Sequence, residues 1–192
     1  MQMIDVGTTR GGERTVAVLL SAPAERLLID TCALLSREFP KVGGPAFNHA
    51  VAGLRSQFRQ EAPAVLTGLM LLLSAMGAAG RLPKLRLGRG RSAGKADVLF
   101  VALLAAAQTG DKGRAIEAAI ALLDTAHVHD VIVAARAVAK RLAEHGMRLR
   151  PIGAATFDYV AGYPAAADTA PAPQINDAEV PRRPVLTLLK SA

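Results

Sequence analysis

The chain has 192 residues and a mass of 20.0 kDa, and its 23 basic and 16 acidic side chains give a formal net charge of 23 − 16 = +7. Its 51% hydrophobic content excludes a fully disordered protein, and the length fits one domain with an appendage. The single cysteine, Cys32, excludes an intramolecular disulfide framework and a cysteine-rich zinc site.

The first segment, residues 1–14, is predicted to be a flexible N-terminal arm. It contains three glycines and four charged residues, and it lacks the apolar core of a secretory signal peptide. We therefore expect a cytoplasmic protein. Residues 15–163 are predicted to form the folded domain, in which 16–20 resembles a short strand but cannot make a sheet alone.

Two amphipathic helices are predicted over 21–38 and 45–61, because their apolar residues recur at helical spacing. Ser21 is a candidate N-cap and Pro23 suits a first turn. Pro40 and the following glycine pair end the first helix. Its apolar positions are Ala24, Leu27, Leu28, Leu34 and Leu35, and those of the second helix are Phe47, Val51, Leu54 and Phe58.

Residues 62–80 carry no charge, which leaves two interpretations open. The stretch approaches the ~20 apolar residues that span a bilayer, and the basic cluster after it fits the positive-inside pattern. Against a membrane span, prolines, glycines and hydroxyl side chains dilute its hydrophobicity. We favour a buried helix of a soluble bundle, and purification without detergent distinguishes the two.

Three further helices are predicted over 96–108, 114–123 and 128–145, with a turn at 109–113 in which Asp111 is a candidate cap. The first is apolar all round and must be central in a core or in lipid. The second is predicted to bury Ile116, Ala119, Ile120 and Leu123. The third is predicted to bury Val128, Val131, Ile132, Ala135, Val138 and Leu142. Phe157 and Tyr159 are expected to hold the last folded element against the domain.

These patterns predict an all-α fold, a compact antiparallel bundle of about six helices. A Pro/Ala-rich tail is predicted over 164–192. The tail returns to apolar residues near position 185, and we expect this patch to dock onto a protein partner. Its members are Val185, Leu186, Leu188 and Leu189.

The connector 81–95 holds six basic side chains and no acidic one, among glycines and a proline that favour a loop. Its basic residues are Arg81, Lys84, Arg86, Arg89, Arg91 and Lys95. A cationic loop binds polyanions through counterion release and without sequence readout. Nucleic acid and an acidic protein surface are both open as partners. A nucleotide-binding P-loop is not supported, because Arg89 and Ala96 occupy positions where that motif needs glycine and a hydroxyl.

The segment DTAHVHD at 124–130 admits a metal site through Asp124, His127, His129 and Asp130. That chemistry needs extended backbone, since residues two apart share a face only in a strand. We favour a structural interpretation in which Thr125 caps the next helix and Asp130 complements its dipole. Cys32 is interpreted as a small buried hydrophobe within a helix.

Functionally, the sequence favours a non-catalytic adaptor or assembly protein that needs no cofactor or metal and contacts a polyanion through 81–95. Two alternatives stay open: a membrane-associated subunit that uses 62–80, and a metal-dependent helical hydrolase that uses 124–130. A homo-oligomer is a further expectation, because the two apolar segments offer more surface than one small bundle covers.

Overall fold

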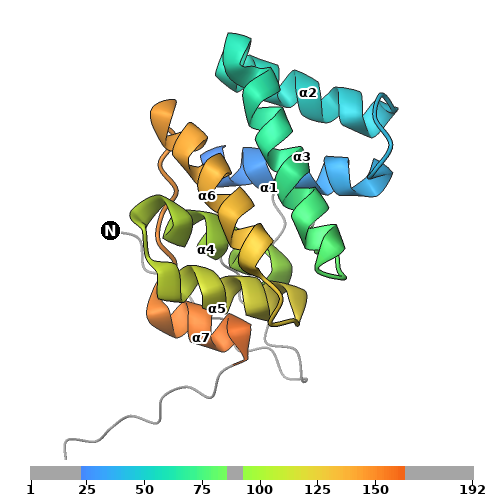
Figure 1. Ribbon diagram of the computed structural model, residues 1–192. Helices are drawn as coiled ribbons and strands as arrows, with labels where there is room; N and C mark the ends of the chain where they lie inside the picture. The colour runs from blue at the N-terminus through green and yellow to red at the C-terminus, as the bar shows by residue number, and fades with distance from the viewer. Residues whose placement is uncertain (1–22, 86–92, 163–192) are drawn as a thin grey trace, which may run out of the picture.

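The computed structural model describes residues 23–85 and 93–162, and within these ranges every regular element is helical (Figure 1). The predicted all-α bundle is confirmed. One short helix, α7, is added to the six expected, and it contains Phe157. The elements are α1 (Pro23–Glu38), α2 (Pro45–Phe58), the 3-10 turn η1 (Arg59–Glu61), α3 (Ala62–Ala78), α4 (Lys95–Thr109), α5 (Lys112–Leu123), α6 (His129–Glu144) and α7 (Ala154–Ala161).

Several expectations fall on residues that the structure does not describe. They are the arm 1–14, the possible strand 16–20, the Ser21 cap, the tail 164–192 with Val185, Leu186, Leu188 and Leu189, and the loop arginines Arg86, Arg89 and Arg91.

The carboxylate of Glu38, the last residue of α1, organises the start of α2. Its two oxygens accept hydrogen bonds from the backbone N–H groups of Ala46 and Phe47, both at 3.1 Å. These groups are among the donors that a helix start leaves without an intrahelical partner. A Cβ on Gly44 would collide with this carboxylate, so glycine is required there for the cap to form.

The uncharged stretch 62–80 becomes α3, which packs between α2 and α6 (Figure 1). One face is buried in the bundle, including Leu69, Leu72 and Met76. Gly68 lets α6 approach closely, because a Cβ there would lie 3.2 Å from a methyl of Val138. The opposite face, which includes Leu71, is exposed.

Helix α4 is central, and it contacts α1, α5, α6 and α7. Ten of its 15 residues are buried, as expected for a helix without a polar face. Its end is polar: the Gln108 amide donates to the carbonyls of Met147 (2.9 Å) and Ala139 (3.3 Å) and accepts from the Leu149 N–H (2.9 Å). These bonds attach the segment after α6 to the bundle.

The predicted buried face of α5 is partly wrong. Ala119 and Leu123 are buried, but Ile116 and Ile120 are 42% and 37% exposed. The face against α4 consists instead of Ala115, Ala118, Ala119, Leu122 and Leu123. Small side chains allow two helices to approach closely, and this gain in packing outweighs the burial of the two larger side chains.

Of the two predicted helix caps, the one at α5 is confirmed and the one at α6 is wrong. Asp111 caps α5 as predicted, since its Oδ1 accepts from the Arg114 N–H at 2.9 Å. Thr125 does not cap α6, which begins at His129 after the buried Val128. The Thr125 hydroxyl instead accepts from the His127 N–H at 3.2 Å and closes a local turn. The buried face predicted for α6 is confirmed in full.

Helix α7 is held by its aromatic residue. Phe157 is fully buried, and the Arg114 guanidinium lies 4.2 Å from the centre of its ring. Arg114 also pairs with Asp158 at 3.4 Å and with Glu117 at 3.2 Å. Phe157 is therefore the anchor that the sequence predicts, whereas Tyr159 is 41% exposed.

Candidate polyanion-binding site

The first half of the candidate site is the segment that follows α3. Gly80 has φ +102°, a conformation that favours glycine, and it turns the chain out of the helix. Pro83 is buried, and Leu82 packs near Phe39 and Gly77. This anchoring holds 81–85 against the bundle and leaves the side chains of Arg81 and Lys84 exposed.

The second half is the start of α4. Gly94 is the N-cap, and its N–H donates to the carboxylate of Asp97 at 2.7 Å. Asp97 is buried, and its negative charge lies in the first turn, where the helix dipole favours it. The cap fixes Lys95 as the first residue of α4, with its side chain exposed.

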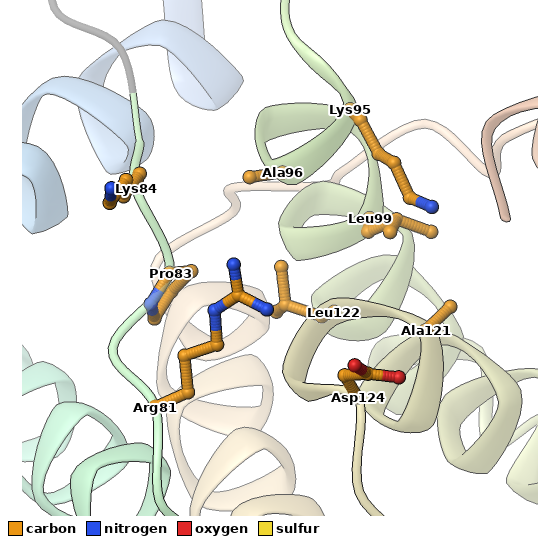
Figure 2. A pocket seen from close by; sticks show the side chains of 9 residues that line it. All are labelled: Arg81, Pro83, Lys84, Lys95, Ala96, Leu99, Ala121, Leu122 and Asp124. Atoms are coloured by element: carbon orange, nitrogen blue, oxygen red, sulfur yellow. The ribbon is translucent and has the colours of Figure 1, made fainter.

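The two halves meet at a cleft of about 360 Å³ (Figure 2). Arg81, Lys84 and Lys95 lie around it, and the Arg81 guanidinium reaches across it toward Leu122. The remaining lining residues are Pro83, Ala96, Leu99, Ala121, Leu122 and Asp124. The cleft therefore combines a cationic rim with an aliphatic floor from α4 and α5.

The charge of the cleft is strongly unbalanced. Three cations face a single carboxylate, that of Asp124, the left-handed cap residue of α5. Among the residues that the structure describes, Arg81, Lys84 and Lys95 form no ion pair within 4.0 Å.

The structure brings together three of the six basic residues predicted for the site. The partners that sequence reasoning missed are Asp124, Ala121 and Leu122. They come from the end of α5, more than 25 positions away in the chain, and no local signal indicates this proximity.

A second basic cleft, of about 420 Å³, was not predicted. It lies between the end of α4 and the outer face of α6, and its cations are Arg136, Lys140 and Arg148. Lys140 lies 3.9 Å from the carboxylate of Glu144, as their spacing predicts. One of its three cations therefore has a local partner, whereas the three of the first cleft form no ion pair with the part of the chain that the structure describes.

The histidine segment does not assemble a metal site in the described part of the chain. Asp124, His127, His129 and Asp130 are all exposed, and residues 23–85 and 93–162 contain no group of three or more His, Cys, Asp or Glu side chains placed to hold an ion.

One helical stretch among the described residues, Pro45–Ala78, is long and apolar enough to cross a membrane by length and composition. It comprises α2, η1 and α3, and Figure 1 shows α2 and α3 at a clear angle to one another. The core helix of a soluble bundle meets the same two criteria.

Comparison with protein-family models, with curated proteins and with solved structures finds no match.

Proposed function

We propose that this protein is a non-catalytic adaptor that binds a polyanionic partner through the cleft at the two ends of the 81–95 connector. One observation carries the proposal: Arg81, Lys84 and Lys95 line the same cleft, and none has an ion-pair partner among the described residues. Binding of the cations releases the polyanion's condensed counterions, and this release supplies the affinity. The affinity therefore depends on charge and decreases as the salt concentration rises.

The lining of the cleft bears on the class of partner. It contains no aromatic side chain, so a nucleobase has no stacking platform in this cleft. Its cations suit phosphate or carboxylate groups and do not read the sequence that carries them. We therefore propose recognition of a polyanion by its charge, with nucleic acid as the first probe and an acidic protein surface as the alternative partner.

The test compares two variants that remove the same charge. The first is Arg81→Gln/Lys84→Gln/Lys95→Gln, and the matched control is Arg136→Gln/Lys140→Gln/Arg148→Gln at the second cleft. Binding to a fluorescein-labelled 20-base-pair duplex is measured by anisotropy from 50 to 200 mM salt. Three lost phosphate contacts lower the slope of log K against log salt by roughly 2.7, so the wild type loses about 40-fold more affinity over this range.

Three outcomes contradict the proposal. Equal losses in both variants would mean that net charge alone governs retention, and a larger loss in the control would place the partner on the second cleft. No binding by the wild type at 50 mM salt would exclude nucleic acid, and an acidic polypeptide such as polyglutamate then replaces the duplex. Failure with both probes refutes polyanion binding.

The connector arginines extend the same test. Neutralising Arg86, Arg89 and Arg91 is expected to weaken binding while the thermal midpoint stays unchanged, since these residues belong to the cationic connector by sequence. A drop in the midpoint would instead assign them a role in stability.

A second candidate function is membrane association through 62–80. It is favoured by the exposed face of α3, where Leu71 is 60% exposed and no residue is charged. Flotation of the purified chain with neutral phosphatidylcholine vesicles tests it, because such vesicles offer no net charge to the basic cleft. Leu71→Lys is expected to abolish flotation if α3 is the anchor.

A further inference from the structure

The described part of the chain leaves the bundle beside the cationic cleft. Gly162 caps α7 in the left-handed conformation, with φ +84°, and turns the chain out of the helix. A Cβ built on Gly162 would lie 4.0 Å from the Nζ of Lys95, one of the three cations of the cleft. The last described residue therefore lies next to one of the cations of the cleft.

The sequence that follows is acidic at first. Residues 163–181 contain Asp168, Asp177 and Glu179 and no basic side chain, and Arg182 and Arg183 come only afterwards. Asp168 is six residues beyond Gly162, so a chain of ~3.3–3.6 Å per residue carries it at most about 20 Å from the exit point. Asp177 and Glu179 have longer tethers, whose lengths also permit them to reach the cleft.

We propose that the acidic segment 164–180 of this chain occupies the cleft when no other partner is bound, and that it competes with the polyanion for Arg81, Lys84 and Lys95. This inference rests on the proposed function of the cleft. The charges are complementary: the segment carries three carboxylates, and the cleft has three cations without an ion-pair partner among the described residues.

The aliphatic floor fits the same occupant. Ile175 and Val180 flank the two carboxylates of Asp177 and Glu179, so the segment offers apolar side chains beside its charges. In the cleft the partly exposed apolar side chains are Ala96 and Ala121, with the buried Leu99 and Leu122 beneath them. A phosphodiester backbone complements the cations of the rim but has no apolar group for the aliphatic floor.

Covalent attachment makes this weak contact effective. A short tether gives an attached ligand an effective concentration in the millimolar range, which a partner must outcompete. Exposed ion pairs are individually weak, so we expect removal of the acidic groups to raise polyanion affinity by roughly three- to tenfold at low salt.

The contact is tested directly by paramagnetic relaxation in the full chain. Cys32 is buried, so a thiol introduced by Thr169→Cys takes the spin label selectively. Broadening of the amides of Ala96, Leu99 and Leu122, reversed at 0.5 M salt, is the expected result. Broadening elsewhere or nowhere overturns the inference. A second sample distinguishes a contact within one chain from a contact between two chains. It mixes spin-labelled chain at natural isotope abundance with ¹⁵N-labelled chain that carries no spin label. Equal broadening in this mixed sample would show that the contact is between chains and would overturn the inference.

The competition is tested by duplex binding. Asp168→Asn/Asp177→Asn/Glu179→Gln is expected to bind three- to tenfold more tightly than the wild type, and the matched control is Glu13→Gln/Glu61→Gln/Asp130→Asn, which also removes three carboxylates. In the background of the Arg81/Lys84/Lys95 variant, the gain is expected to disappear. An equal gain in the control, or a gain that survives in that background, overturns the inference. If the duplex binds at the cleft without any tail effect, only this inference fails, whereas loss of duplex and polyglutamate binding alike removes the proposed function.

Discussion

The thiol of Cys32 offers a sharp test of the packing of α1. Cys32 is completely buried, and this burial raises the pKa of the thiol far above its usual value, because the thiolate cannot be solvated in the core. The folded protein therefore keeps the thiol proton at a pH where an unfolded chain, with a pKa near ~8.5, releases it.

The sign and size of the effect follow from proton linkage. Above about pH 8.5 the unfolded state binds fewer protons than the folded state, so the free energy of unfolding falls as the pH rises. The slope approaches ~1.4 kcal/mol per pH unit, and the accumulated loss at pH 10 is about 2 kcal/mol. Below pH 8 this group contributes no pH dependence.

The assay is urea unfolding of the wild type and of Cys32→Ala from pH 7 to pH 10. Lysine and tyrosine titrations affect both proteins alike, so the difference between the two curves isolates the thiol. We expect the wild type to lose about 2 kcal/mol relative to Cys32→Ala between pH 8 and pH 10. Parallel curves would refute the reasoning, because they would mean that the thiol ionises in the folded protein.

Two further predictions concern polar groups that hold the bundle together. Gln108→Ala removes three hydrogen bonds and leaves the N–H of the buried Leu149 without its acceptor, so urea unfolding is expected to show a loss of roughly 1–3 kcal/mol; a change below ~0.5 kcal/mol would contradict it. Gly44→Ala is expected to cost about 1–2 kcal/mol, because its Cβ displaces the Glu38 carboxylate from the start of α2. That cost should shrink in a Glu38→Ala background, and full additivity would argue against the cap.

The helix pattern of this chain is readable from sequence because most helices have one apolar face and clear stop signals. The buried face of α6 follows directly from its spacing. The face of α5 does not, because two adjacent stripes compete: one contains Ile116 and Ile120, and the other is rich in alanine. Hydrophobicity favours the isoleucine stripe, whereas close approach to α4 favours the alanine stripe, and only the tertiary packing decides between them.

The candidate site also combines features that the local sequence predicts with features that depend on residues far apart in the chain. The cationic character of 81–95 is evident from composition alone. The cleft cannot be predicted from composition, because part of its lining comes from the end of α5. Its position also depends on how Leu82 and Pro83 pack against the bundle. The error at Thr125 has a local cause: a hydroxyl before a helix can cap it or close a turn, and the burial of Val128 selects the turn.

The burial of α4 explains why polar groups gather in the connector but not why they share one sign. A helix enclosed on all sides can be reached by solvent only at its ends, so the segments that lead into it must be polar. A connector with both acidic and basic side chains would be solvated equally well, and its charges would repel one another less. Six cations without a single acid between positions 81 and 95 exceed that requirement. Binding of an anion would relieve the repulsion among these six cations, which is the physical reason to expect an anionic partner at the connector.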